Sequence, residues 1–234
     1  MTNELLAVRG LHAFYGESHI LHGVDFSVRR GEVVTLLGRN GAGRTTTLKA
    51  LLGVVGSRSG SVLIDGKETI DLPPHAVARL GVGYCPEERG IFSALSAEEN
   101  LLLPPVVAPG GMSIDEIYGM FPNLAERRAT QGTRLSGGEQ QMLAVARILR
   151  TGAKLLLLDE ISEGLAPVIV QTLSRTIHAL REKGYTIVMV EQNFRFAAPL
   201  ADRLYIMERG RIVLDFPASE LQDKMTVLHE YLGV

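Results

Sequence analysis

Several features that would point to particular classes of protein are scarce or absent in this sequence. A single cysteine, Cys85, excludes a disulfide within the chain. The 24 Lys and Arg are offset by 26 Asp and Glu, so the composition gives no reason to expect a nucleic-acid partner or a polybasic membrane surface. The apolar runs, such as LLLLD and TIVMV, are far shorter than the roughly 20 residues needed to cross a bilayer. The start, MTNELLAVRG, lacks the layout of a signal peptide, and we expect a cytoplasmic protein.

The sequence does contain enough apolar material for a full core. With 234 residues, 46% of them hydrophobic, the chain can form one large α/β domain or two modest ones. The apolar clusters of residues 4–37 predict several strands, the last of which leads into a glycine-rich loop and then a helix at TTTLKALLGV. SVLIDG and GVGYC predict two more short strands, joined by a polar connection that contains Pro73 and Pro74.

The second half of the sequence alternates helices with buried strands. Helical patterns dominate between about 91 and 150, and two of them, SAEENLLL and SGGEQQMLAVARIL, begin with a serine three residues before a glutamate, as in a capping box. VVAPGGMS, between them, predicts a loop. KLLLLDE and YTIVMVEQ predict buried parallel strands, separated by a helix over about 167–183. LYIMERGRIVLDF predicts a terminal hairpin, and a short helical tail follows it.

The stretch GRNGAGRTTT differs at one position from the phosphate-binding pattern G-x-x-x-x-G-K-[ST]. In that pattern the glycines let backbone N–H groups close around phosphates, the lysine reaches the β- and γ-phosphates, and the hydroxyl holds Mg²⁺. Here Arg44 stands at the lysine position. The predicted strand before the loop and the predicted helix after it are the context that a phosphate loop requires, and a plain glycine turn would not predict them.

Two acidic residues end the apolar run LLLLDE. This places Asp159 and Glu160 at the C-terminal mouth of a buried strand, where α/β sheets bind ligands. An aspartate there could hold Mg²⁺, and the adjacent glutamate could orient or deprotonate an attacking water. Taken alone, the pattern could equally mark an acidic helix N-terminus, and it gains force from the phosphate loop in the same chain.

The segment LSGGEQQ offers a serine hydroxyl and two glycine N–H groups at a helix start, which is an anion site by geometry and dipole. A capping box alone would need no ligand. Two consecutive glycines at a helix start would then be an entropic cost without a purpose, and this favours a functional role.

Together, GRNGAGRTT, LSGGEQQ and LLLLDE, in this order and spacing, resemble the nucleotide-binding subunit of an ABC transporter. The resemblance covers essentially the whole chain. It implies one α/β domain over residues 1–234, with a P-loop ATPase core, an antiparallel β subdomain and an inserted α-helical subdomain at about 91–150. It also implies a head-to-tail dimer in which ATP lies between the phosphate loop of one subunit and the LSGGE segment of the other, which explains why one chain carries two anion sites.

The resemblance also implies roles for individual residues around ATP. The phosphates would be held by residues of the glycine-rich loop: Gly38, Asn40, Gly41, Gly43, Arg44 and Thr46. The partner's site would be completed by Ser136, Gly137 and Gly138. Tyr15 matches the aromatic residue that stacks on adenine, although a lone tyrosine in a strand is more often part of the core.

The same resemblance assigns the metal and the chemistry. Thr45 and Asp159 would serve Mg²⁺. Glu160 would be the general base and Gln192 would contact the γ-phosphate. Glu87 would sense the γ-phosphate region and relay its state to the permease.

Some positions depart from the common pattern of the family and indicate one branch of it. Glu87 replaces the usual glutamine, Gln192 replaces the usual histidine, and Ala166 replaces the usual aspartate. These three resemble the ATPases of branched-chain amino-acid importers. Ile161, where that branch usually has proline, does not follow this explanation.

The branch implies a set of partners. They are a second, similar ATPase subunit in a homo- or heterodimer, two membrane permeases, and a periplasmic or extracellular binding protein that acts indirectly. The chain would then be peripheral on the inner face of the cell membrane, held there by the permeases. The transported solute would be a branched-chain amino acid or a related small polar solute.

Arg44 departs from every branch of the family. Arginine keeps the positive charge, but its planar fork is not interchangeable with a lysine ammonium, so we expect a working but impaired ATP site. A rival interpretation is a nucleotide-binding structural subunit that does not hydrolyse ATP because of Arg44. A second rival is a soluble ABC ATPase of ribosomes or DNA repair, but those usually carry two cassettes or long insertions, for which this chain has no room.

Overall fold

The computed structural model describes residues 3–233, and its centre is a six-stranded sheet in the order β10-β9-β3-β8-β7-β6. Its strands are β3 (Val33–Leu37), β6 (Val82–Cys85), β7 (Leu155–Asp159), β8 (Thr186–Glu191), β9 (Arg203–Glu208) and β10 (Arg211–Pro217). All neighbours pair in parallel except β10, which forms a hairpin with β9. Every residue of β3, β7 and β8 is buried, because both faces of the parallel sheet are covered.

A second, antiparallel sheet in the order β2-β1-β4-β5 lies beside the first. It consists of β1 (Glu4–Tyr15), β2 (Ser18–Arg29), β4 (Ser57–Ile64) and β5 (Lys67–Glu68). Helix α1 (Arg44–Leu52) packs into the core that this sheet shares with β3, β7 and β8, through buried residues such as Leu48 and Leu51. The phosphate loop therefore lies where the two sheets meet.

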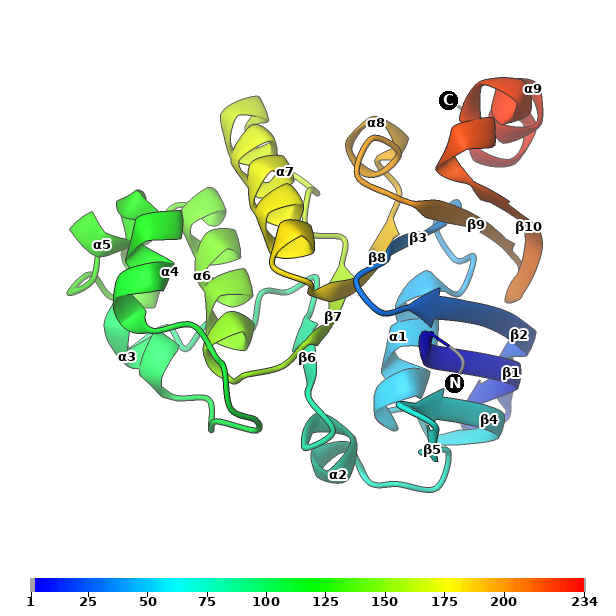
Figure 1. Cartoon of the computed structure of the whole chain (residues 1–234), viewed down its shortest axis with the longest axis horizontal. Helices are drawn as coiled ribbons and strands as arrows, with labels where there is room; N and C mark the ends of the chain where they lie inside the picture. Colours follow the sequence, from blue (N-terminus) through cyan, green and yellow to red (C-terminus); the bar gives the residue numbers. More distant parts are fainter. Residues whose placement is uncertain (1–2, 234) are drawn as a thin grey trace.

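A lobe of helices occupies the opposite end of the molecule, in green in Figure 1. Its elements are α3 (Ala97–Leu102), α4 (Ile114–Met120), α5 (Pro122–Glu126), the 3₁₀ turn η1 (Gly132–Arg134) and α6 (Gly137–Arg150). The capping boxes predicted for α3 and α6 are present, and α4 has a third, formed by Ser113 and Glu116. Each box satisfies backbone N–H groups that the first turn of a helix leaves unpaired.

The remaining helices cover the central sheet or connect its strands (Figure 1). They are α2 (Pro74–Ala78), α7 (Pro167–Glu182), α8 (Phe194–Ala197), the 3₁₀ turn η2 (Ala218–Glu220) and α9 (Leu221–Leu232). The predicted helix over 167–183, the hairpin and the helical tail are confirmed. The polar connection at Pro73 and Pro74, for which no helix was predicted, contains α2, with Pro74 at its first position, where a missing N–H does no harm. Within residues 3–233 no helix is both long enough and apolar enough to cross a membrane.

Candidate functional site

The glycine-rich loop joins the end of β3 to the start of α1, as the sequence predicted. Gly41 and Gly43 have φ of 79° and 103°, in the left-handed region that other residues enter at a cost. A Cβ on Gly38 would lie 2.5 Å from the carbonyl oxygen of Met207. These three glycines are therefore required by the backbone of the loop itself, and the loop closes around a hollow.

That hollow has a volume of about 300 Å³ and brings together segments that are far apart in the sequence. Most of its lining consists of residues that the sequence predicted, and they come from the loop, from the segment after β6 and from the end of β7. The full lining is Asn40, Gly41, Ala42, Gly43, Arg44, Thr45, Thr46, Glu87, Glu160 and Glu163, of which Ala42 and Glu163 were not predicted. Since backbone N–H groups at a helix N-terminus favour anions, the hollow suits phosphate groups.

Arg44 forms a buried ion pair with Glu160 inside this site. Its side chain is only 4% exposed, and one guanidinium nitrogen, Nη2, donates to Glu160 Oε1. The other two nitrogens, Nε and Nη1, are buried without a hydrogen-bond partner. Buried donors without acceptors are costly, and phosphate oxygens in the adjacent hollow would be suitable acceptors.

Asp159 lies beside this pair and is held by two hydroxyl groups. Its Oδ1 accepts a hydrogen bond from Thr45 Oγ1 at 2.8 Å, and its Oδ2 accepts one from Tyr84 Oη at 2.8 Å. Burial raises the pKa of Asp159, while the two hydrogen bonds oppose that shift. A buried carboxylate next to a threonine hydroxyl matches the oxygen ligands that Mg²⁺ prefers, so the residues present fit this ion.

Over the described range 3–233, no group of three or more His, Cys, Asp or Glu is arranged to hold a metal. Two protein ligands are enough for Mg²⁺, which keeps several waters and is commonly shared with substrate phosphates.

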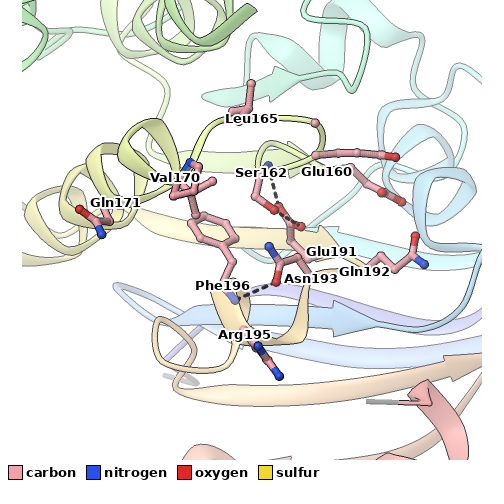
Figure 2. A pocket seen from close by; sticks show the side chains of 13 residues that line it. Glu160, Ser162, Leu165, Val170, Gln171, Glu191, Gln192, Asn193, Arg195 and Phe196 are labelled. Atoms are coloured by element: carbon pink, nitrogen blue, oxygen red, sulfur yellow. Dashed lines mark hydrogen bonds between the residues drawn. The ribbon is translucent and has the colours of Figure 1, made fainter.

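A larger hollow of about 770 Å³ adjoins the first, and Figure 2 shows its lining. Glu160 and Glu163 line both hollows, whereas Gln192 lines only the larger one. Glu160 has φ of 46°, which is uncommon for a residue other than glycine and is found often at functional sites. A side-chain hydrogen bond with Glu160 raises the pKa of Glu163.

Glu191, the last residue of β8, also lines the larger hollow and is 1% exposed. Its carboxylate accepts hydrogen bonds from both the backbone N–H and the hydroxyl of Ser162, at 3.1 and 2.8 Å. Burial raises the pKa of Glu191 to about 7, against the effect of these hydrogen bonds.

Six of the predicted site residues do not line either hollow of this chain. Two of them still belong to the first site, because Gly38 begins the glycine-rich loop and Asp159 is hydrogen-bonded to Thr45. Ser136, Gly137 and Gly138 lie at the start of α6, where Ser136 caps the helix and Gly137 is exposed. Tyr15 lies at the end of β1 with 42% of its surface exposed, so the alternative that it is a core residue is wrong.

One argument for a functional LSGGE segment needs correction. The two glycines were expected to have no structural purpose, but a Cβ on Gly138 would lie 2.7 Å from Ile169 Cγ1 on α7. Close packing of α6 against α7 is therefore sufficient reason for that glycine. A Cβ on Gly137 would meet no atom so closely, since its nearest neighbour, Arg89 Nη1, would be 3.3 Å away.

Sequence reasoning missed Tyr84, Glu163 and Glu191. Tyr84 reaches Asp159 because β6 and β7 are parallel neighbours, and nothing in the sequence indicates that pairing. Glu191 did carry a signal, since it ends the apolar run TIVMV in the way that Asp159 ends LLLL. Glu163 follows Glu160 by three residues, and only the turn between them brings both into the hollow.

Comparison with protein families identifies the chain. A family model described as "ABC transporter" matches residues 21–163, which span the phosphate loop, the LSGGE segment and Glu160. The chain belongs to the ABC transporter family. It is an ABC-type ATPase, and its predicted fold class is confirmed.

Two curated relatives and two solved structures illustrate the range of similar ABC ATPases. The chain is 41% identical to BraG of Pseudomonas aeruginosa, a high-affinity branched-chain amino acid transport ATP-binding protein, over 98% of this chain and 100% of that one. It is 33% identical to LptB of Escherichia coli, a lipopolysaccharide export system ATP-binding protein, over 97% of each. A solved ATP-binding subunit of an ABC transporter is 27% identical with a TM-score of 0.80, over 98% of this chain and 96% of that one. A nucleotide-free cassette, 22% identical, shares the fold with a TM-score of 0.83 over 95% of each chain.

Proposed function

We propose that this ABC ATPase hydrolyses ATP to drive import of branched-chain amino acids or related small polar solutes through partner permeases. The observation that carries the hydrolytic part is the meeting of Arg44, Thr45 and Glu160 around one hollow, with Asp159 hydrogen-bonded to Thr45 behind its lining. The 41% identity to BraG, together with Glu87 and Gln192, supports the choice of solute.

In this proposal the main residues of the site have separate tasks. The backbone of Gly41 and Gly43, with Asn40 and Thr46 beside it, surrounds the phosphates. Mg²⁺, held by Thr45 and Asp159, would neutralise charge on the phosphate oxygens. Glu160 accepts a proton from the attacking water, and its position at the rim of both hollows leaves room for that water.

Arg44 and Glu160 must separate, at least in part, before that step can take place. A carboxylate whose oxygen accepts a hydrogen bond from a guanidinium is a poorer proton acceptor than a free one. Phosphate oxygens would draw Arg44 away, since its two unpartnered nitrogens need acceptors. The site would therefore work, but with part of the binding energy used to break the pair.

The proposed assembly places residues of two chains around each ATP. Ser136, Gly137 and Gly138 lie away from both hollows, so we assign them to the ATP of a second ATPase subunit. Two permeases would hold the pair at the inner face of the membrane, and a binding protein would deliver solute to them. The chain would act as one domain, with about 91–150 as its helical subdomain.

Two alternatives are distinguishable from this proposal. A subunit that binds ATP without hydrolysing it is less favoured, because Asp159, Glu160 and Thr45 are all present and in contact with one another or with Arg44. A role in export is raised by the similarity to LptB.

Transport by a reconstituted complex tests the proposal. The chain is assembled in lipid vesicles with the permeases encoded beside its gene, the second ATPase subunit and the binding protein. Uptake of labelled leucine is then measured with ATP either inside or outside the vesicles. We expect uptake that requires ATP on the side of the ATPase and is lost in a complex carrying Glu160→Gln. ATP hydrolysis without import of any branched-chain amino acid or small polar solute would contradict the proposed solute class.

A further inference from the structure

Glu191 has no task in the chemistry proposed above, although it lies next to the groups that do. It is the last residue of β8, and β8 pairs in parallel with β7, which ends at Asp159. Its carboxylate is buried, and over residues 3–233 its hydrogen bonds come from Ser162. A buried carboxyl that loses its donors is costly, so this contact resists separation.

The contact with Ser162 fixes the backbone on one side of Glu160. On the other side, the backbone N–H of Glu160 donates to the carbonyl of Val190 at 2.9 Å. Glu160 itself has the left-handed φ of 46°, a conformation that persists only where the surroundings enforce it. Two adjacent residues of β8, Val190 and Glu191, therefore hold both flanks of Glu160. Figure 2 shows the contact between Glu191 and Ser162.

Glu191 also fixes the chain on one side of Gln192. On the other side, Asn193 caps α8, where its Oδ1 accepts from the backbone N–H of Phe196 at 3.2 Å. Figure 2 shows both anchors to the left of Gln192, whose side chain points away from them, toward the side of the view where Glu160 lies. One carboxylate thus links the segment of the proposed base to the segment of the proposed γ-phosphate contact.

We propose that Glu191 is a positioning residue, which clamps the loop of residues 160–165 to the end of β8 through Ser162 and so sets Glu160 and Gln192 in register with each other. The inference rests on the proposed hydrolysis of ATP at this site. Misplacement of a catalytic group by about 1 Å can lower a rate by about 100-fold, so a clamp of this kind matters for turnover more than for ATP binding.

Three variants test the clamp by steady-state ATP hydrolysis. Glu191→Ala removes both acceptors, Ser162→Ala removes one donor, and Glu191→Gln keeps an acceptor for the backbone N–H and an amide that can donate to the Ser162 hydroxyl. We expect kcat to fall about tenfold in Glu191→Ala with KM for ATP within about twofold, an intermediate loss in Ser162→Ala, and at least half the natural kcat in Glu191→Gln.

Glu68 offers a matched control outside the site. It accepts hydrogen bonds from the Ser61 hydroxyl and from backbone N–H groups of β4 and of the residues that follow β5, and so resembles Glu191 in its contacts. Glu68→Ala should lower thermal stability and leave the kcat of the folded protein unchanged. If Glu191→Ala also changes only stability, or if Glu191→Gln fails to preserve kcat, Glu191 is not a positioning residue.

Hydrogen exchange separates failure of this inference from failure of the proposed function. Amide exchange in residues 160–166, measured by mass spectrometry without nucleotide, should become at least tenfold faster in Glu191→Ala and remain nearly unchanged in Glu191→Gln. This readout does not depend on hydrolysis. If the natural protein proves inactive but exchange responds in this way, the clamp stands and the proposed function fails; if exchange does not respond, the clamp is wrong whatever the activity.

Discussion

Glu160, the residue after β7, and Glu191, the last residue of β8, lie at the same edge of the central sheet, yet they have different surroundings. Glu160 follows β7 and pairs with a charged residue, Arg44, at the rim of the phosphate-loop hollow. Glu191 ends β8 and is held by a neutral residue, Ser162, away from that hollow. Glu160 thus has access to the space where phosphates would lie, whereas Glu191 does not.

The comparison teaches how neighbouring acids can be assigned separate roles. A residue that must exchange a proton with water needs access to it, as Glu160 has at the rim of both hollows. A residue that holds backbone in place needs stable donors and no competition from solvent, as Glu191 has. Each of the following predictions would break or sharpen this division.

The largest effect should come from Glu160→Gln. Because the amide cannot accept the proton of water, ATP hydrolysis should fall by about 100-fold or more while ATP still binds. The variant should also trap the ATP-bound dimer. A rate close to that of the natural protein would remove Glu160 from the mechanism and end the contrast with Glu191.

The same substitution has a second consequence without nucleotide. It leaves the guanidinium of Arg44 buried without its counter-charge, which should lower the melting temperature of the nucleotide-free protein. The melting temperature of the ATP-bound protein should fall less. Differential scanning calorimetry with and without ATP measures both values. An equal loss in the two states would mean that phosphates do not take over the contacts of Arg44.

The next effect concerns the pH dependence of stability. The raised pKa of Glu191 means that the folded protein keeps a proton that the unfolded chain releases, so stability is lost as pH rises from about 4.5 to about 7. Glu191→Gln does not titrate. Its free energy of unfolding relative to the natural protein should therefore rise between pH 5 and pH 8, by on the order of 3 kcal/mol if the shift is fully realised. A difference that is constant with pH would show that Glu191 does not keep this proton.

Replacement of Arg44 should have a smaller effect, in either direction. Arg44→Lys removes the fork that engages Glu160 and supplies a compact ammonium, so it should tighten ATP binding and raise turnover by about tenfold at most. Arg44→Ala should lower both below the natural protein. Equilibrium binding of ATP and steady-state turnover of the three forms decide this, and no gain with lysine would mean that the loop has adapted to arginine.

Tyr15→Ala should have the smallest effect. The ring is exposed, so its loss should leave melting nearly unchanged. If it stacks on adenine, ATP affinity should fall by about fivefold, in line with an aromatic contact of about 1 kcal/mol. Unchanged affinity for ATP would place adenine elsewhere.

The local part of the site was predictable because it depends on local backbone chemistry. The glycines of the phosphate loop, the capping boxes at Ser96 and Ser136, and the acidic end of LLLLD each carry their meaning in a few neighbouring residues. The short helix α2 was missed although Pro74 stood in a position typical of a helix start.

The contacts between segments were not predictable, because they depend on strand order. Arg44 meets Glu160 across 116 positions of sequence, and Tyr84 meets Asp159 across 75. Neither pairing has a sequence pattern of its own. Ile161 is a related case, because the sequence alone does not explain why it departs from the family pattern. In the structure it is buried in the core that includes residues of α6 and α7, and an apolar side chain suits that position.

The most direct test of the account is hydrolysis of ATP in the site that contains Arg44. The natural chain is assembled with its permeases and with a second ATPase subunit whose own catalytic base has been replaced, so that this site alone can turn over. The account predicts steady-state hydrolysis slower than that of Arg44→Lys and well above that of Glu160→Gln in the same complex. ATP that binds to the natural chain but is hydrolysed no faster than in Glu160→Gln would contradict it.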